Sequence, residues 1–190
     1  MTEPRENDSP PEPLQSAMIA DLLAATAVTV EAELRALAAM AGWRPAPGEW
    51  SANECVGHLI EAERRGFAGR IRTILGSRRS DGSFEPPALE GWDPPAVAAA
   101  RHDDQRPPAE LAAEFAERRA ESVELVRSLA PDDLGRAGIH PEVGRLRVDE
   151  VLGEWVHHDR NHIRQLLAVT QSRVWDQMGN ARTFSILELE

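Results

Sequence analysis

The stretch VDEVLGEWVHHDRNHIRQLLAV, residues 148–169, combines an apolar helical face with three histidines. Residues that recur three or four positions apart share one face of an α-helix. Here the apolar residues at that spacing are Val148, Val151, Leu152, Trp155, Leu166 and Val169. His158 and His162 fall on the same face, one turn apart, whereas His157 falls on the opposite side. The stretch therefore predicts a helix that points two imidazoles into the protein and one to solvent.

Three further helices are predicted before this one. The first spans residues 14–40, and its recurring positions are Met18, Leu22, Ala25, Thr29 and Ala32. The second spans residues 51–75 and begins at a capping box, in which Ser51 and Glu54 satisfy free amides at the helix start. The third spans residues 109–129 and follows two prolines.

The segment between the second and third helices, residues 76–107, is rich in Gly, Pro and charge. It predicts a long crossover with a short helix near residues 96–101. No alternation of period two indicates a strand of ordinary length. Four helices with one long crossover between helices two and three predict an all-α four-helix bundle.

The domain organisation follows from the same pattern. Residues 1–13 are rich in Pro and charge and predict a disordered leader. We expect residues 14–175 to form the bundle and residues 176–190 to form a C-terminal extension, with a small strand-like tail as the alternative.

Composition excludes several classes of function. The 190 residues carry a formal net charge of −11, which argues against nucleic acid and anionic membranes as partners. All 21 basic residues are Arg, so no lysine is available for Schiff-base chemistry or a phosphate loop. The single Cys55 cannot form an internal disulfide. With no apolar run of membrane-spanning length and no signal-peptide core, the expected location is the cytoplasm.

The histidine pair predicts a metal site. Two imidazoles one turn apart on a helix can bind one ion, and the alternative is a pair of core histidines bonded to protein groups. A catalytic ion needs a third ligand from another element. The candidates are His58, His102, His140, Cys55, Glu54 and Glu61. Helical periodicity alone places His58 at the rim or in solvent.

Other catalytic patterns fail. The E-x-x-H motif occurs once, at Glu154 and His157, whereas di-iron bundles need it twice. The motifs H-E-x-x-H, G-x-S-x-G and G-x-G-x-x-G are missing from the sequence, which removes the usual metalloprotease, serine-hydrolase and dinucleotide-binding signatures.

Two segments together resemble the DinB-like (DinB/YfiT-like) metalloenzyme superfamily. They are PGEWSANECVGHLIEAE, residues 47–63, and HPEVGRLRVDEVLGEWVHHDRNHIRQLL, residues 140–167. Members carry one histidine in a W-S-x-x-E-x-x-x-H-L context and two in an H-D-x-x-H-x-x-Q context. The resemblance implies a four-helix bundle with a long crossover and a divalent metal held by His58, His158 and His162.

The resemblance also implies chemistry. Relatives include thiol-dependent transferases and isomerases that use bacillithiol or mycothiol, and others are hydrolases. We therefore expect one divalent ion, zinc or nickel first and iron or manganese as alternatives, with a low-molecular-weight thiol as a further cosubstrate. The substrate is a small molecule, and the resemblance implies a homodimer. The alternative is a non-catalytic metal- or ligand-binding bundle, such as a stress-response or sensor protein.

Four residues are candidates for the surroundings of the ion. Glu61 and Asp159 neighbour ligands in sequence and could orient imidazoles, although Asp159 could equally be a surface carboxylate. Trp155 could wall the pocket, with core packing as the alternative. Arg65 could hold a substrate carboxylate or simply pair with Glu61 one turn earlier. Cys55 is read as a small buried residue.

Overall fold

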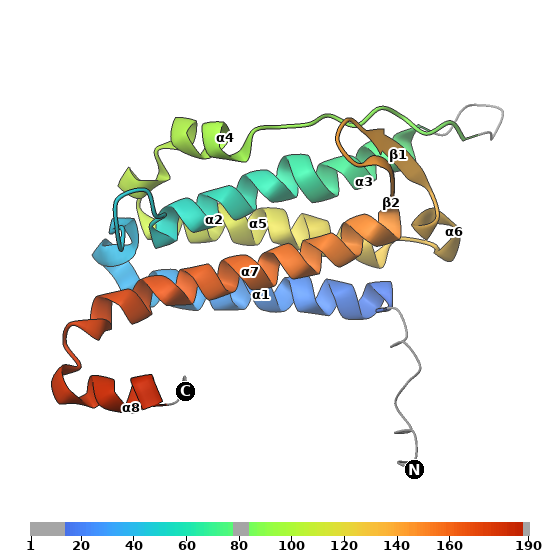
Figure 1. The fold of residues 1–190 in the computed structure, drawn as a ribbon. Coiled ribbons are helices and arrows are strands. Elements are labelled where there is room, and N and C mark those ends of the chain that lie inside the picture. The colour runs from blue at the N-terminus through green and yellow to red at the C-terminus, as the bar shows by residue number, and fades with distance from the viewer. Residues whose placement is uncertain (1–13, 78–83, 188–190) are drawn as a thin grey trace, which may run out of the picture.

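Four long helical segments pack as a bundle in the computed structural model, which describes residues 14–77 and 84–187 (Figure 1). The first segment is α1 (Ser16–Leu37), followed by the short 3₁₀ helix η1 (Ala38–Gly42). The second is a continuous run of α2 (Ala52–Glu61), the π-helix η2 (Ala62–Phe67) and α3 (Ala68–Gly76). The third and fourth are α5 (Pro108–Arg127) and α7 (Val148–Trp175). The predicted all-α bundle is confirmed, and the predicted leader at residues 1–13 lies outside the described residues.

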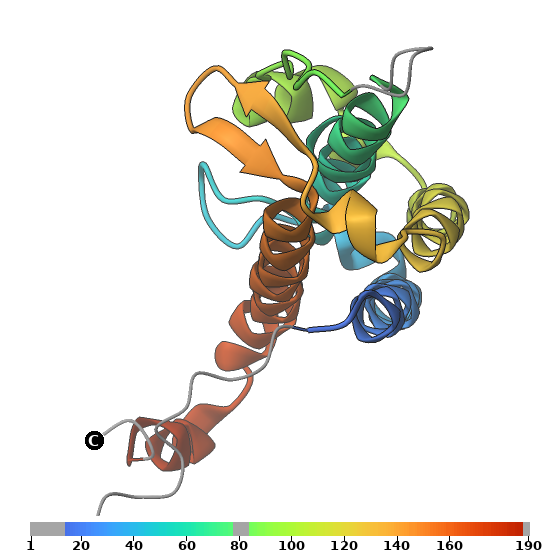
Figure 2. The same ribbon diagram turned by 90° about the vertical axis from the view of Figure 1, so that its right-hand side faces the viewer.

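The helices do not pack in the order in which they follow one another. α1 packs mainly against α5 and α7, and α2 packs against the same two helices from the other side. The end-on view shows α1 and the α2–α3 segment at opposite corners (Figure 2). The long crossover makes this order accessible, because it carries the chain from the end of α3 back to the start of α5.

The crossover contains the short helix that the sequence predicted, α4 (Pro94–Arg101), followed by η3 (Asp103–Gln105). Both pack on α2. They bring a second layer over α2, whose residues are therefore buried almost all round. This covering decides the surroundings of His58.

The buried face of α1 differs from the prediction. Its buried residues are Ile19, Ala20, Leu23, Thr26, Val30, Leu34 and Leu37. Met18 is 53% exposed, and Ala25 and Ala32 are also exposed. The helix is so rich in alanine that apolar spacing fits more than one face, and the larger branched side chains decide which face is buried.

The second segment begins where expected but is not a regular α-helix. Ser51 Oγ accepts a hydrogen bond from the Glu54 amide, and the Glu54 carboxylate accepts one from the Ser51 amide. A π-helical turn then interrupts the predicted run at residues 62–67. Such a turn inserts one extra residue into a helix and is frequent at functional sites.

A small hairpin precedes α7 and was not predicted. After α6 (Pro131–Leu134), β1 (Ala137–His140) pairs antiparallel with β2 (Gly144–Arg147). Ala88 of the crossover forms a parallel bridge with Ile139, so the crossover adds a third strand-like segment. Gly138 is required there, because a Cβ atom would lie 2.7 Å from Leu89 Cγ. The strands are too short to show a period of two.

Of the two alternatives for the C-terminal residues, the strand-like tail is wrong where the structure describes them. Residues after α7 form the 3₁₀ helix η4 (Gly179–Ala181) and α8 (Arg182–Leu187). This helical end extends away from the bundle (Figure 2). Within residues 14–77 and 84–187, no helix is both long and apolar enough to cross a membrane.

Candidate metal centre

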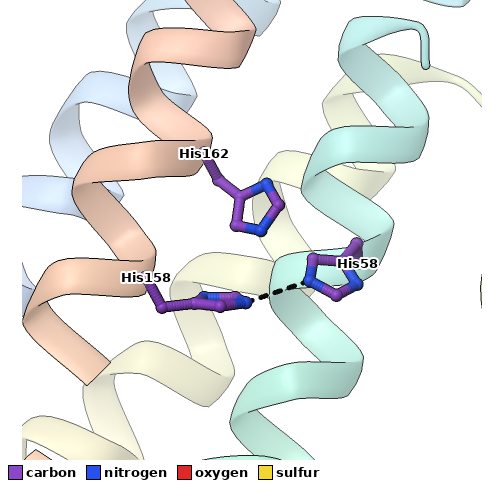
Figure 3. Close-up of side chains that lie close together, drawn as sticks. All are labelled: His58, His158 and His162. Carbon is purple, nitrogen blue, oxygen red and sulfur yellow. Dashed lines mark hydrogen bonds between the residues drawn. The ribbon is translucent and has the colours of Figure 1, made fainter. Parts of the chain in front are cut away.

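Three histidines from two helices converge in the middle of the bundle (Figure 3). His58 comes from α2, and His158 and His162 come from successive turns of α7. The Nε2 atoms of His58 and His158 lie 3.0 Å apart, and one ring nitrogen from each of the three lies within 4.8 Å of the others. Among the described residues, His58, His158 and His162 are the side chains of metal-ligating type that lie close enough together to hold an ion.

The distance between His58 Nε2 and His158 Nε2 fits a shared ion. Two nitrogens that ligate one ion at about 2.0–2.1 Å lie about 3.0–3.4 Å apart, depending on the angle between them. The Nδ1 atoms of His58 and His158 are buried and bond to no described protein group. A direct hydrogen bond between the two Nε2 atoms requires the two rings to adopt opposite tautomers. A shared ion requires instead that both rings carry the proton on Nδ1 and direct the Nε2 lone pair at the ion.

His162 is set in the tautomer that a metal ligand needs. Its Nδ1 lies 2.9 Å from Gln165 Oε1, one turn further along α7. An amide oxygen only accepts, so His162 Nδ1 carries the proton and Nε2 keeps its lone pair. Gln165 therefore acts on the site through His162.

The three imidazoles are neutral at physiological pH. Burial lowers the pKa of His58 and of His158 to about 3, and the neighbouring histidines add to the effect at His58. Burial also lowers the pKa of His162, partly offset by Gln165. Only the neutral ring offers a lone pair to a metal ion, so the cluster is ready to ligate without first losing protons.

Aromatic rings enclose the cluster. Trp50, from the loop before α2, packs at 5.0 Å on His58 and stacks at 6.1 Å on His162. Trp92, from the crossover, stacks on the His58 ring at 5.9 Å and 21°. Phe67, from the π-helix, meets His158 edge-on at 5.1 Å. These rings restrict water around the histidines and fix their planes.

Cys55 touches the cluster but is no candidate ligand. Its Sγ lies 3.4 Å from the His162 carbonyl oxygen and 3.8 Å from His162 Nδ1. Burial raises the pKa of the thiol to about 12, so it stays protonated at neutral pH. It packs beneath His162 as a small buried residue.

Glu61 and Arg65 lie beside the site rather than on the histidines. The buried Glu61 carboxylate accepts hydrogen bonds from Arg65 Nε at 2.7 Å and Arg101 Nη1 at 2.9 Å. Burial alone would raise the pKa of Glu61, but these arginines lower it. The i,i+4 pair that was the alternative for Arg65 is therefore formed, and Glu61 ties the crossover to α2.

Asp159 and Trp155 are both buried beneath the site. The Asp159 carboxylate is not a surface group; it binds Arg119 of α5, which also donates to Glu63 Oε1 at 2.9 Å and to the Leu23 carbonyl oxygen. Trp155 stacks on Phe67 at 5.2 Å, and Phe67 in turn meets His158. Trp155 thus reaches His158 only through Phe67, whereas the charge of Asp159 raises the pKa of His162 and partly offsets the effect of burial there.

The remaining histidines lie elsewhere. His157 is exposed, as the helical face predicted, and faces Asn161. His102 is exposed at a left-handed backbone position with φ of 52°. His140 is buried next to Arg70. The expectation of a rim position for His58 is wrong, since only 6% of this residue is exposed.

A cavity of about 550 Å³ leads to the cluster from one side. The loop before α2 and the last turns of α7 line it, with Glu49, Trp50, His162, Gln165 and Ser172 among the lining residues. A small molecule in this cavity meets the open side of His162.

The aromatic wall and the buried arginine were missed from the sequence. Trp50 and Gln165 stand inside the two quoted motifs, so their fixed spacing from His58 and His162 was an available signal. Trp92 and Arg119 lie in segments whose packing partners only the fold reveals.

Comparisons with known proteins agree on the fold. The family model described as DinB superfamily matches residues 22–166. The structure of YfiT from Bacillus subtilis superposes on this chain with a TM-score of 0.71 at 19% sequence identity, and the match covers 90% of this chain and 92% of YfiT. YfiT is described as a probable metal-dependent hydrolase with an unusual four-helix bundle topology. The colibactin self-resistance protein ClbS, in a complex with double-stranded DNA, gives 0.59 at 13% identity over 84% of this chain and 98% of ClbS. A search of curated proteins returned no match.

Proposed function

This chain belongs to the DinB superfamily, and from that premise we propose that it is a divalent-metal-dependent enzyme that hydrolyses a small molecule. The observation that carries the proposal is the convergence of three neutral imidazoles, from His58, His158 and His162, within 4.8 Å. Three protein ligands leave coordination positions open, as catalytic sites require. The description of YfiT as a probable metal-dependent hydrolase supports the same chemistry.

Each part of the site has a task in this proposal. When bound, a divalent ion lowers the pKa of water or of a thiol at an open position and so supplies a nucleophile at neutral pH. The histidines offer neutral nitrogen ligands, which suit zinc or nickel first and iron as an alternative, with manganese the least favoured by this ligand set. Gln165 holds the His162 proton on Nδ1. Trp50, Trp92 and Phe67 exclude water from the ligand side, and the 550 Å³ cavity receives the substrate.

The partners follow from charge and from the resemblance. ClbS was crystallised with double-stranded DNA, but the net charge of −11 on this chain opposes phosphate binding, and we propose a small-molecule substrate without nucleic acid. The resemblance also implies a homodimer, and analytical ultracentrifugation of the purified protein would test this prediction.

Elemental mass spectrometry of the purified protein tests the metal. We expect about one divalent ion per chain in the wild type. His58→Ala and His158→Ala should lose it, and His157→Ala, an exposed neighbour on the same helix, should keep it. Failure of the wild type to bind zinc, nickel, iron or manganese would overturn the proposal.

Assays on the loaded protein then separate the chemistries. Chelator-sensitive cleavage of ester or amide substrates without thiol supports hydrolysis. Turnover only with bacillithiol, mycothiol or glutathione and an electrophile would replace hydrolysis by thiol transfer at the same site. Bound metal without turnover of any of these substrates would contradict the enzyme proposal and favour a sensor or binding bundle.

A further inference from the structure

A second cavity, of about 320 Å³, lies between the π-helix, α3 and the start of the crossover. Three arginines line it from the helical side, namely Arg64, Arg65 and Arg70, and we call it the arginine pocket. Trp92 and Glu90 line it from the crossover. The chain as a whole has a net charge of −11, whereas these three guanidinium groups make the surroundings of the cavity locally positive.

The positive charge of the pocket is only partly neutralised. Arg64 and Arg65 share one carboxylate, that of Glu61, at 3.6 Å and 2.7 Å, and Arg101 uses the same carboxylate. Glu90 is an exposed lining residue and supplies one further negative charge. Guanidinium groups therefore outnumber the carboxylates that face them.

Arg70 is the least compensated of the three. Among described residues no carboxylate lies within 4.0 Å of it, and Glu142 and Glu154 act on its charge only from a greater distance. Its Nε is buried without a hydrogen-bond partner. Burial lowers the pKa of Arg70, which is the signature of a cation that lacks a close counter-charge.

The contact between Arg70 and His140 does not supply the counter-charge that Arg70 lacks. Arg70 Nη2 lies 2.9 Å from His140 Nε2, and the Glu142 amide donates to His140 Nδ1 at 3.3 Å. A neutral imidazole has one accepting nitrogen, so the two donors compete for a single lone pair. When the Glu142 amide uses that lone pair, Arg70 Nη2 is left without an acceptor there, and an oxyanion in the pocket would supply one.

The arginine pocket adjoins the histidine cluster through one ring. Trp92 lines the pocket and stacks on His58 at 5.9 Å and 21°. Trp92 therefore lies between the arginine pocket and His58, and the pocket shares no lining residue with the 550 Å³ cavity at His162.

We propose that the arginine pocket binds an oxyanion group, a carboxylate or a phosphate, of a small molecule. Paired N–H donors of guanidinium match the two oxygens of either group. The ligand class is thus a small molecule that carries a carboxylate or a phosphate.

Calorimetric titration of the whole protein with inorganic phosphate and with succinate tests the pocket. The indole ¹⁵N–¹H signal of Trp92, assigned by Trp92→Phe, reports whether the anion binds next to that ring. We expect saturable binding of at least one anion, weakened about tenfold or more in Arg70→Gln, because a charge-assisted bidentate contact is lost. The tighter of the two probes identifies the group as phosphate or carboxylate.

Matched variants make the test specific. Arg72→Gln changes the same charge on the same helix, but Arg72 faces Glu121 and does not line the pocket, so its binding should stay within about twofold of wild type. Arg64→Gln, at a half-exposed residue, should also weaken binding and serves if Arg70→Gln does not fold.

The experiment distinguishes a failure of the arginine-pocket proposal from a failure of the metal-site proposal. Binding of neither probe, or equal weakening in Arg70→Gln and Arg72→Gln, would overturn the arginine pocket while leaving the metal analysis untouched. Anion binding that survives Arg70→Gln but disappears in His158→Ala would assign the anion to the metal centre and also overturn the pocket. Binding that persists in His158→Ala and disappears in Arg70→Gln supports it.

Discussion

At the scale of single residues, the histidine cluster depends on which nitrogen of each ring carries its proton. Gln165 decides this for His162, because its amide oxygen accepts from Nδ1. Cys55 lies against both residues but supplies only weak sulfur contacts at 3.8 Å and 3.9 Å. The position of the His162 proton therefore depends on the hydrogen bond to Gln165, while Trp50 stacks on the ring plane.

Replacing Gln165 by Leu should weaken metal binding without removing a ligand. Loss of a partner that orients a ligating histidine typically costs about 10–100-fold in metal affinity. Competition titration with a chromophoric chelator measures this. Gln171→Leu, an exposed glutamine on the same helix, is the control and should bind as wild type. Equal affinity of the two variants would mean that Gln165 does not position His162.

The position of His58 shows what residue patterns could not predict. Periodicity assumes that a helix has one buried face and one solvated face. α2 has no solvated face, since the bundle covers one side and α4 with η3 covers the other. Gly57 illustrates the second contact, because a Cβ atom there would lie 1.8 Å from Asp103 Oδ2. The family resemblance placed His58 in the site where amphipathicity could not.

At the scale of elements, a buried ionic cluster holds four helical segments together beneath the histidines. Arg119 of α5 binds Asp159 of α7, Glu63 of the π-helix and the Leu23 carbonyl of α1. All three side chains are almost fully buried. Its guanidinium also lies 4.8 Å from the Phe115 ring centroid. Burial raises the pKa of Glu63, so this carboxylate depends on Arg119 to stay ionised.

Arg119→Met should destabilise the protein strongly. The methionine fills most of the volume but leaves two carboxylates buried without a counter-charge, which costs about 3–5 kcal/mol of unfolding free energy. Urea unfolding measures the loss. Arg127→Met removes an exposed pair from the same helix to Asp21 of α1 and should cost about 1 kcal/mol or less. Similar losses in both variants would contradict the special role of the buried cluster.

Helix boundaries were predictable from local signals, whereas two irregular elements were not. The Ser51 and Glu54 capping box and the prolines before α5 are local, and the helices begin within one residue of them. The π-turn at residues 62–67 depends on burying Glu63 against Arg119, a contact made across the fold. The hairpin at residues 137–147 depends on the crossover, whose Leu89 amide bonds to the Ile139 carbonyl.

At the scale of the whole molecule, three uncharged histidines in a bundle interior couple folding to pH. The folded pKa values of His58 and His158 are about 3, against an ordinary 6.5, and that of His162 is also lowered. Near pH 6 these histidines therefore bind protons in the unfolded chain but stay neutral in the folded chain. The contribution of these histidines to stability is full only well above the unfolded pKa of 6.5, and it falls as the pH drops toward 3.

Between pH 6.5 and 5, Glu54 and Glu61 stay ionised because their pKa values are lowered, and the raised pKa of Glu63 affects wild type and the histidine variants alike, so it cancels when their slopes are compared. For metal-free protein we expect the unfolding free energy to fall by about 1.4 kcal/mol for each unit by which the pH is lowered, for each histidine that is protonated only in the unfolded chain. His158→Gln removes one such group, so its slope against pH should be shallower than that of wild type by about that amount. His157→Gln, at an exposed position, is the control and should keep the wild-type slope. Urea unfolding at pH 6.5, 6.0, 5.5 and 5.0 gives the slopes, and parallel lines for wild type and His158→Gln would show that His158 takes up a proton in the folded state as readily as in the unfolded one.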